Sequence, residues 1–388
     1  MLIISFDAVG DDEFDRLMEY PAFSALARQA AVFRGVCSVH VSNTYPVHTS
    51  VATGVTPNIH GLIANTLPFP EKYPVWNVDE RRIRAKTLWQ AAAERGIDTA
   101  AVFWPVTAFS KTIRYNIPEV LARPGKSQIA TSLKAGSKRL QLKMLLRHRK
   151  MLQGIRQPSL DNFAAACMAD ILRERKPGLA LIHLTAYDSL CHKHGKGSGP
   201  LKQAFDSLDS NLSLLLEAAG EDRDVILFSD HSQINLHTYI EPNNILVEAG
   251  LIGREGDVYI PGESGCFFEC CSGSAFFHAG ALPDGRVEEL REIIGQNEGF
   301  RRFFTREELT KSGYDGAAFG FCAEAGYCYA AFTHSHKADH GYPTDIPGYS
   351  VFYMARGLGL TPGAVAQGGS LLDIAPRVSK ALGISLTI

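Results

Sequence analysis

Aspartate and histidine residues stand where short apolar segments of this chain end. Six of these residues are candidate metal ligands: Asp7, Asp188, His192, Asp230, His231 and His340. The last of them belongs to a late Asp-His-Gly-Tyr segment. Carboxylates and imidazoles are ligands of zinc and of related divalent cations. The residue types therefore predict a site that holds a pair of metal ions.

The segment Ser42–His48 adds a hydroxyl group that could attack a substrate. A threonine hydroxyl is a weak nucleophile at its free pKa, and metal ions activate such groups in phosphoryl transfer. Small residues at 49–54 are typical of a helix start, where N–H groups point at an incoming phosphoryl oxygen. Thr44 is the preferred nucleophile. Ser42 and Thr49 are rivals, and a helix-capping role for Thr44 is the structural alternative.

Each ligand segment taken alone has an ordinary structural explanation. Asp188 and His192 share a helix face, but such pairs occur by chance in many helices. Asp7 could cap a helix, and His340 could be a loop histidine with rivals at His334 and His336. The metal hypothesis therefore depends on the joint occurrence of these segments.

The elements that must position these residues follow a strand–helix alternation. Continuous apolar runs predict buried strands at 2–6, 99–103, 179–184 and 225–228. Helical periodicity predicts helices at 14–30, 87–95, 160–175 and 201–219. This alternation predicts an α/β fold with a mainly parallel central sheet covered by helices on both faces. Ligands bind beyond the carboxyl ends of such strands, where Asp7, Asp188 and Asp230 fall. Their placement supports the metal hypothesis independently.

Two stretches interrupt the alternation and divide the chain into five segments. The catalytic core comprises 1–112, 159–249 and 320–388, with a late strand expected at 351–354. The basic segment 113–158 is either a solvated amphipathic helix that docks its leucines on the core or a lid that contacts an anionic substrate. The segment 250–319 is expected to be an α+β cap, with a strand at 276–278 and a helix at 286–297.

Composition limits the partners and the compartment. The 388 residues carry a formal net charge of -2, which argues against a nucleic-acid polymer and leaves a small phosphorylated substrate. No apolar run approaches the roughly 20 residues of a membrane span, and the strand pattern begins at Leu2, so we expect neither a span nor a signal peptide. Eight dispersed cysteines indicate reduced thiols and a cytoplasmic protein. The cluster Cys266, Cys270 and Cys271 lacks the paired spacing of a structural zinc site.

Assembled, these motifs resemble the nucleotide pyrophosphatase/phosphodiesterase branch of the alkaline phosphatase superfamily. The family's Thr-aromatic-Pro-Asn-His segment matches Thr44–His48 and departs at Val47. Its first-strand Asp, its Asp-x-x-x-His, its Asp-His pair and its Asp-His-Gly all have counterparts here. Tyr187 and Cys191 stand where the family commonly has Pro and Gly.

The resemblance implies an alkaline phosphatase-like core and two zinc ions per chain, with manganese or iron as possible substitutes. One zinc ion would be held by Asp188, His192 and His340. The other would be held by Asp7, Asp230 and His231, with Thr44 between the two ions as ligand and nucleophile. Asn65 matches an asparagine that holds a phosphoryl oxygen, although it could also serve a turn, and Asp339 is a candidate to orient the His340 ring. The implied activity is hydrolysis of phosphodiester or pyrophosphate bonds through a phospho-threonine.

Related chemistries differ at identifiable residues. His48 stands where a sulfatase has arginine, and alkaline phosphatases use serine as the nucleophile. Phosphonoacetate hydrolases use threonine with two zinc ions and are the alternative enzyme; a relative that binds without catalysis is the alternative from another class. Nucleotide-cleaving members place an aromatic side chain shortly before the Asp188-type ligand. Here only His183 and Tyr187 occupy that stretch, so recognition of a nucleobase stays open.

Overall fold

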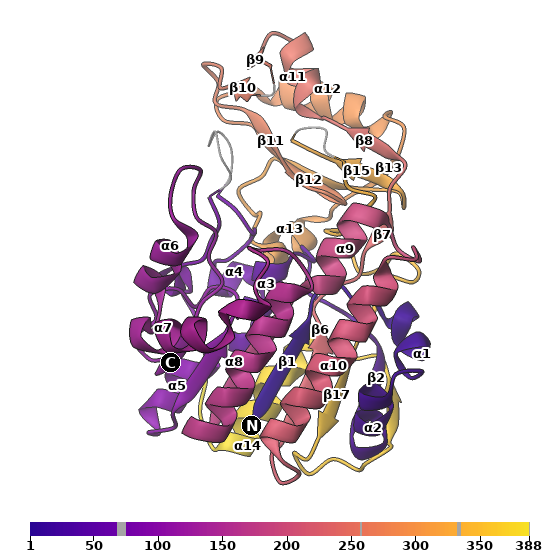
Figure 1. The fold of residues 1–388 in the computed structure, drawn as a ribbon. Coiled ribbons are helices and arrows are strands. Elements are labelled where there is room, and N and C mark those ends of the chain that lie inside the picture. The colour runs from indigo at the N-terminus through magenta and orange to yellow at the C-terminus, as the bar shows by residue number, and fades with distance from the viewer. Residues whose placement is uncertain (68–74, 257, 332–334, 388) are drawn as a thin grey trace.

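An eight-stranded sheet forms the centre of the molecule in the computed structural model, which describes residues 1–67, 75–256, 258–331 and 335–387. The strand order is β18-β2-β17-β6-β1-β5-β3-β4 (Figure 1). Its strands are β1 (Leu2–Phe6), β2 (Ala31–Val36), β3 (Thr99–Val102), β4 (Tyr115–Ile117), β5 (Leu179–Leu184), β6 (Val225–Ser229), β17 (Val351–Arg356) and β18 (Val365–Gln367). The four strands expected first and the late strand are all present.

The pairing is mainly parallel, as predicted. β1 pairs in parallel with β5 on one side and with β6 on the other over its whole length. β3 continues the parallel order next to β5, whereas β17 runs antiparallel to both β6 and β2. The three central strands are fully buried, which explains why each reads as a continuous apolar run.

Helices cover both faces of this sheet, also as predicted. Leu2, Ile4 and Phe6 pack with one helical layer, and Ile3 packs with the other, because successive side chains of a strand point to opposite faces. The first layer comprises α2 (Pro21–Gln29), α8 (Ser159–Arg175), α9 (Ala186–His194) and α10 (Leu201–Ala219). The second layer comprises α3 (Thr44–Thr53), α5 (Leu88–Glu94) and α14 (Ile374–Leu382).

One expected helix is wrong in detail. The segment 14–30 forms two short helices, α1 (Phe14–Leu17) and α2, rather than one. Pro21 is the first residue of α2, and Tyr20 before it is extended at φ -96° and ψ 133°. A proline disfavours the helical conformation of the residue that precedes it, so the apolar periodicity continues while the backbone breaks.

The basic segment forms two helices at the edge of the sheet, after β4. These are α6 (Gln128–Ala135) and α7 (Lys138–His148), followed by a 3-10 turn, η3 (Arg149–Met151). Leu140 and Met144 of α7 are buried in the core, whereas Leu146 is exposed. Arg147 forms ion pairs with Asp170 and Glu174 of α8. The segment therefore docks on the core as an amphipathic helix does.

A second lobe lies above the carboxyl ends of the central strands in Figure 1. Its four-stranded antiparallel sheet has the order β11-β12-β14-β13. The lobe contains β8 (Thr238–Ile240), α11 (Asn243–Glu248), β9 (Gly253–Glu255), β10 (Val258–Ile260), β11 (Phe267–Cys271), β12 (Ser274–His278), α12 (Asp284–Gly295), β13 (Phe300–Phe303), α13 (Arg306–Ser312), β14 (Phe319–Ala323) and β15 (Tyr327–Tyr329). The expected strand and helix of the cap correspond to β12 and α12. The division into five segments stays a prediction.

Short elements complete the chain. They are η1 (Asp11–Glu13), α4 (Pro57–His60), η2 (Glu80–Arg82), β7 (Ile234–Asn235), β16 (Ala338–Asp339) and η4 (Leu371–Asp373). All eight cysteines are unpaired. Within the described ranges, we find no helix with both the length and the apolar character that a membrane crossing requires.

Candidate metal centre

Four distant segments meet at the carboxyl edge of the central sheet. Asp7 directly follows β1, Asp230 follows β6, and Asp188 lies in the first turn of α9, which follows β5. β16 pairs antiparallel with β7, so that Asp339 lies opposite Ile234. This pairing carries His340 to the same edge. The convergence follows from parallel strand order for the first three segments and from the β7–β16 pair for the fourth.

The first group of potential ligands comprises Asp188, His192 and His340. Their ligand atoms all lie within 4.8 Å of one another. Asp188 Oδ1 lies 3.2 Å from His192 Nε2, because one turn of α9 places both side chains on one face. Although burial opposes it, the carboxylates of Asp188 and Asp339 raise the pKa of His192 to about 10. The same three residues were grouped on the resemblance alone.

The second group comprises Asp7, Asp230 and His231, all of them buried. His231 Nε2 lies 3.3 Å from Asp7 Oδ1 and 3.4 Å from Asp230 Oδ2. Among the described residues, neither of these two carboxylate oxygens has a hydrogen-bond partner. Burial and the charges of Asp188 and Asp230 raise the pKa of Asp7. Buried carboxylate oxygens without donors are costly, and a cation between them would supply the missing partner. The donor set fits a metal ion.

All three ligand histidines turn Nε2 toward the centre. His192 Nδ1 donates to the Ala338 carbonyl at 2.8 Å, and His231 Nδ1 donates to the Ser232 carbonyl at 3.2 Å. A carbonyl oxygen cannot donate, so Nδ1 must carry the proton in both rings. In the neutral form of each ring, Nε2 then has the lone pair that binds a metal ion.

The His340 ring is held by a residue that the sequence did not reveal. Its Nδ1 lies 2.9 Å from Asn43 Oδ1. Asp339, the expected partner, instead accepts hydrogen bonds from the His340 backbone N–H at 2.9 Å and from His336 Nδ1 at 3.1 Å. The expectation that Asp339 orients the ring is therefore wrong, and Asn43 has that position. Asn43 directly precedes Thr44, and this adjacency was the available signal.

Thr44 is the first residue of α3, and its hydroxyl faces the second ligand group. Thr44 Oγ1 lies 3.3 Å from His231 Nε2. The His231 and His340 rings, one from each group, have centroids 4.2 Å apart. Asn43, not Thr44, occupies the N-cap position of α3. The capping alternative for Thr44 is thus wrong, and its hydroxyl lies beside the second group.

The rival hydroxyl groups are engaged in structural hydrogen bonds. Ser42 Oγ donates to the Tyr342 carbonyl at 2.8 Å, and Thr49 Oγ1 donates to the Tyr45 carbonyl at 2.8 Å. Both side chains are buried. Neither hydroxyl is presented to the centre as that of Thr44 is.

Asn65 is tied to the start of α3. Its Oδ1 accepts a hydrogen bond from the Tyr45 N–H at 2.8 Å. Between described residues, no hydrogen bond uses its Nδ2 group. Asn65 therefore lies beside the expected nucleophile with an amide N–H group left to donate. The turn role that was its alternative does not account for the bond to α3.

Two further histidines lie behind the second group. His48 Nδ1 donates to the Thr44 carbonyl at 2.8 Å, and its Nε2 accepts from Ser5 Oγ at 2.8 Å. Burial lowers the pKa of His48 to about 4, so the ring is neutral near pH 7. His183 Nε2 lies 3.2 Å from Asp7 Oδ2. The Thr44–His48 motif signalled the first of these histidines, and no motif signalled the second.

The two candidates for stacking on a nucleobase do not face the centre. Tyr187 is fully buried and donates its hydroxyl hydrogen bond to Glu13 at 3.0 Å, and His183 is buried against Asp7. Tyr45 and Trp76 instead line a cavity of about 450 Å³ beside Thr44. Their ring centroids are 5.4 Å apart. Neither aromatic residue was singled out in the sequence for this role.

Of the rivals to His340, only His336 lies within the described residues. With His192 and Asp339 it forms a third group whose ligand atoms are within 4.8 Å of one another. His334 lies outside the described residues. The third group shares His192 with the first.

Comparison with known proteins identifies relatives over most of the chain. The profile of the type I phosphodiesterase / nucleotide pyrophosphatase family matches residues 1–300. The chain is 21% identical to ectonucleotide pyrophosphatase/phosphodiesterase family member 1 of Rattus norvegicus over 261 residues, 62% of this chain and 26% of the relative. It is 20% identical to venom phosphodiesterase 2 of Crotalus adamanteus over 205 residues, 50% of this chain and 22% of the relative. The chain thus spans about a quarter of the length of these relatives.

Two solved structures share the fold almost end to end. Inactive murine ectonucleotide pyrophosphatase/phosphodiesterase 5 in complex with AMP superposes with a TM-score of 0.72 at 15% identity, covering 100% of this chain and 96% of that chain. Phosphonoacetate hydrolase from Sinorhizobium meliloti in complex with phosphonoacetate superposes with a TM-score of 0.71 at 18% identity, covering 98% and 95%. The expected alkaline phosphatase-like architecture is confirmed.

Proposed function

This chain belongs to the type I phosphodiesterase / nucleotide pyrophosphatase family, and from its centre we propose that it hydrolyses phosphodiester or pyrophosphate bonds with Thr44 as the nucleophile. The observation that carries the proposal is the position of the Thr44 hydroxyl, 3.3 Å from Nε2 of His231, whose ring centroid lies 4.2 Å from that of His340 in the other ligand group. The cofactor we propose is a pair of zinc ions. When bound, they would lower the pKa of the attacking hydroxyl and neutralise charge on the phosphoryl group.

In the proposed first step, Thr44 Oγ1 loses its proton and attacks phosphorus. The bond between phosphorus and the leaving oxygen breaks, and the departing oxygen takes up a proton. Asn65 Nδ2 donates to a non-bridging oxygen as charge develops there, and the N–H groups at the start of α3 add to this stabilisation. The product of the step is a phospho-threonine.

In the second step, water attacks phosphorus and breaks the bond to Thr44 Oγ1. Thr44 recovers its hydroxyl, and the phosphoryl group leaves with the water oxygen. His48 holds the Thr44 carbonyl, so the nucleophile stays fixed through both displacements. Asn65 Oδ1 accepts a hydrogen bond from the Tyr45 N–H, and this bond keeps the Asn65 amide, which contacts the phosphoryl oxygen, in a fixed position relative to α3.

Two alternatives concern the substrate. The fold shared with phosphonoacetate hydrolase favours cleavage of a phosphonate at the same centre. The murine neighbour in complex with AMP favours a nucleotide-type substrate. We propose a phosphodiester as the first candidate substrate because its phosphoryl group carries a single negative charge. Contacts from Thr44 and Asn65 are nearly sufficient for the oxygens of such a group. A cytoplasmic location is proposed from the eight unpaired thiols.

The test is hydrolysis by purified, zinc-loaded protein and by its Thr44→Ala variant. Bis-p-nitrophenyl phosphate, p-nitrophenyl phosphate, a p-nitrophenyl nucleoside ester and phosphonoacetate would be compared. We expect preference for a diester, and Thr44→Ala should lower kcat about a thousandfold or more with the metal content unchanged. Thr44→Ser is the matched control and should retain measurable turnover. Near-normal activity of Thr44→Ala would refute the nucleophile, and preference for phosphonoacetate would select the alternative.

A further inference from the structure

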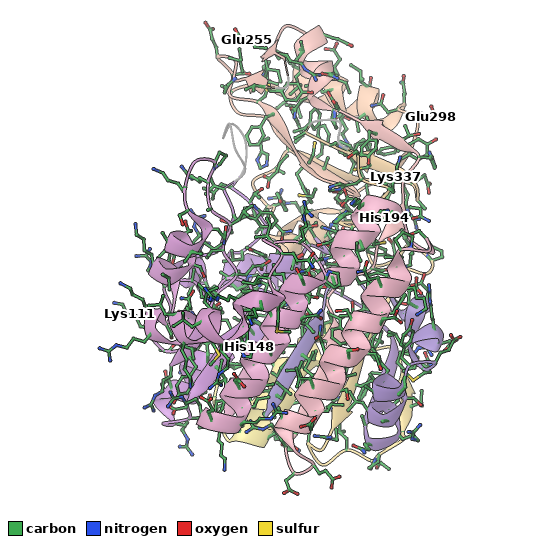
Figure 2. All side chains as sticks on the ribbon, in the orientation of Figure 1. Lys111, His148, His194, Glu255, Glu298 and Lys337 are labelled. Carbon is green, nitrogen blue, oxygen red and sulfur yellow. The ribbon has the colours of Figure 1, made fainter. Side chains whose placement is uncertain are left out.

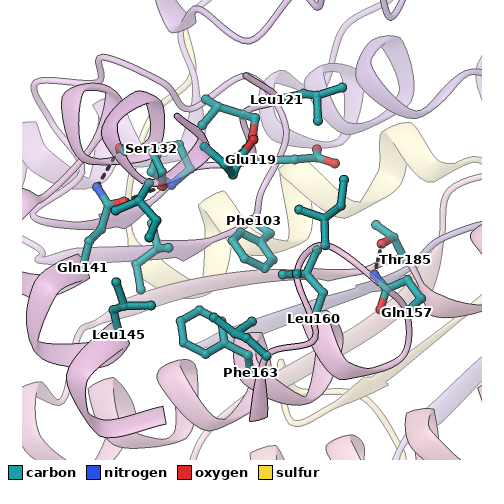
Figure 3. Close-up of a pocket in the computed structure, with 18 of the residues that line it drawn as sticks. Phe103, Glu119, Leu121, Ser132, Gln141, Leu145, Gln157, Leu160, Phe163 and Thr185 are labelled. Carbon is teal, nitrogen blue, oxygen red and sulfur yellow. Dashed lines mark hydrogen bonds between the residues drawn. The ribbon is translucent and has the colours of Figure 1, made fainter. Parts of the chain in front are cut away.

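A cavity of about 450 Å³ separates the helical insertion from the core (Figure 3). This volume lies within the usual range for small-molecule sites. Its walls are predominantly apolar and come from both sides: Leu145 of α7 faces Phe103, Leu160 and Phe163 of the core. The basic segment thus forms one wall of an apolar space that is open to solvent at one side.

One end of this cavity is lined by residues next to those of the metal centre. Tyr45, which directly follows Thr44, lines it, as do Thr185 and Ser189 at the start of α9. α9 carries Asp188 between these two residues. The cavity is therefore lined by the sequence neighbours of Thr44 and Asp188.

The glutamine side chains of the lining are already hydrogen-bonded within the protein. Gln128 donates to the Val120 carbonyl at 2.7 Å and accepts from the Ala122 N–H at 2.9 Å. Gln141 donates to the Ser132 carbonyl at 2.9 Å and accepts from Ser132 Oγ at 2.6 Å, one of the bonds drawn in Figure 3. Each of these amides is thus held in place by one donated and one accepted hydrogen bond.

The third glutamine is engaged in the same way. Gln157 donates to Asp161 Oδ1 at 2.7 Å and to Thr185 Oγ1, and it accepts from the Asp161 N–H at 3.2 Å. A nucleobase requires donors and acceptors that match its edges. A predominantly apolar lining whose glutamines are held by protein partners favours an occupant that makes few polar contacts.

Glu119 supplies a carboxyl group to the lining, and this group is neutral near pH 7. Burial raises the pKa of Glu119 to about 8, and its Oε2 has no hydrogen-bond partner among the described residues. An uncharged carboxyl is compatible with an apolar neighbour, whereas a carboxylate is not. Glu119 thus places no charge in the cavity.

Exposed apolar side chains surround the opening to solvent. Leu121, Ile129 and Ile155 line the cavity and are 52%, 53% and 58% exposed. Large exposed apolar residues that belong to one cavity are typical of ligand entry. The side chains at the opening are therefore apolar, as most of those in the interior are.

We propose that this cavity binds a hydrocarbon chain of the substrate, so that the protein prefers phosphodiesters with a long apolar substituent. The proposal rests on the proposed function for the reaction at Thr44. The chain would pass Tyr45, lie between α7 and the core, and reach the rim at Ile129 and Ile155. Each buried methylene would strengthen binding until the cavity is full.

The test is a series of p-nitrophenyl phosphodiesters that differ only in the second substituent: methyl, butyl, octyl and dodecyl. We expect KM to fall by up to about fourfold per methylene and then to level off. Direct binding of the corresponding alkyl methyl phosphates, followed by calorimetry, provides a readout that does not require turnover. A KM and an affinity that do not vary with chain length would overturn the proposal.

Ile129→Glu and Ile155→Glu place a charge on the cavity rim at exposed positions, where the fold should tolerate it. Both should weaken binding of the octyl compound tenfold or more and leave the methyl compound unchanged. Leu146→Glu is the matched control, because Leu146 belongs to the same insertion, is 74% exposed and does not line the cavity. If Leu146→Glu weakens binding of monomeric octyl compound as much as Ile129→Glu does, the cavity is not the site.

The same variants distinguish a membrane lipid from a dissolved amphiphile as the source of the chain. With dodecyl ester in vesicles of anionic phospholipid, Leu146→Glu should lower the rate only if the insertion docks on the bilayer. An equal rate would assign the cavity to dissolved amphiphiles. If no ester is hydrolysed but the octyl compound still binds and Ile129→Glu weakens it, the reaction at Thr44 fails while the cavity proposal stands.

Discussion

Three histidines direct the same ring nitrogen, Nε2, at the metal centre, although three different acceptors hold their Nδ1 atoms. Two of these acceptors are backbone carbonyls, of Ala338 and Ser232, and cannot be removed by substitution. The third is the Asn43 side chain on His340. The centre therefore has one ligand whose orientation depends on a single replaceable group.

Replacing Asn43 by Ala should weaken metal binding at the group formed by Asp188, His192 and His340. The His340 ring would lose its acceptor and could rotate, and such partners typically contribute 10- to 100-fold in metal affinity or activity. Zinc titration with a competing chelator measures the loss. Asn43→Asp, which keeps an acceptor oxygen at the same place, should retain most of the affinity. Equal affinity in all three proteins would show that Asn43 does not orient the ring.

Glu119 predicts how stability depends on pH. Its folded pKa of about 8 lies above the ordinary value of 4.5, so the folded state binds more protons than the unfolded state between these values. The stabilisation is complete below about pH 4.5 and is lost as pH rises toward 8. Glu119→Gln removes this titration. Urea unfolding at several pH values should therefore show that the variant gains stability relative to wild type as pH rises, because the other titrations are shared. A difference independent of pH would contradict a neutral Glu119.

At the scale of elements, the position of α9 depends on a carboxylate from another helix. Asp161 of α8 accepts hydrogen bonds from the Thr185 N–H at 3.0 Å and the Ala186 N–H at 2.7 Å. These N–H groups begin the helix that carries Asp188 and His192. Unpaired N–H groups at a helix start need such acceptors. Asp161 is fully buried, and water therefore does not replace it.

Asp161→Asn should destabilise the protein by about 2 kcal/mol and weaken metal binding, because an amide N–H would oppose a backbone N–H. The matched control is Asp209→Asn. Asp209 accepts from the N–H groups of Ala22 and Phe23 at the start of α2, which carries no ligand. Denaturation and zinc titration of both variants separate the effects: both should lose stability, and only Asp161→Asn should lose affinity. Similar metal affinities in the two variants would show that α9 holds its position without Asp161.

The sequence was most informative about the elements that lie in the sheet. Continuous apolar runs and strand–helix alternation predicted β1, β3, β5 and β6 and placed Asp7 and Asp230 at the carboxyl edge. The approach of His340 was predicted from the resemblance and not from periodicity, because it depends on two-residue strands, β7 and β16, that lack any periodicity. The Asn43 and Asp161 contacts join different segments of the chain, and no sequence pattern pairs these residues; the adjacency of Asn43 to Thr44 was the one available signal. The pattern at 14–30 was misleading because periodicity continues through Pro21.

At the scale of the molecule, the metal centre joins the core to the second lobe. The Gly273 N–H donates to the His340 carbonyl at 2.9 Å, and Ser274 Oγ, at the start of β12, donates to the Gly341 carbonyl at 2.7 Å. Figure 1 shows this lobe above the edge where β1 and β6 end. One ligand is therefore fixed by the second lobe, while the others belong to the core. A cation bound by both parts would stabilise their packing.

Metal removal should consequently lower the unfolding temperature of the whole protein. A ligand at 100 times its Kd stabilises the folded state by about 2.7 kcal/mol. Without a cation, one buried oxygen each of Asp7 and Asp230 has no hydrogen-bond partner within the described part of the chain, which adds to the loss. Calorimetry in zinc-buffered solutions and in chelator measures the shift, which should grow with free zinc concentration.

The Asp230→Asn variant tests whether this dependence of stability on zinc belongs to the metal centre. The variant loses a ligand, so zinc should stabilise it less than wild type. In chelator it should unfold at a higher temperature than wild type, because one uncompensated buried charge is gone while the amide oxygen can still accept from the Ala8 and His231 N–H groups. An exposed substitution in the second lobe, such as Glu255→Gln, is the control and should respond to zinc as wild type does. If wild type unfolded at the same temperature with and without zinc, or if Asp230→Asn were the less stable protein in chelator, the buried carboxylates would not be sites that await a cation.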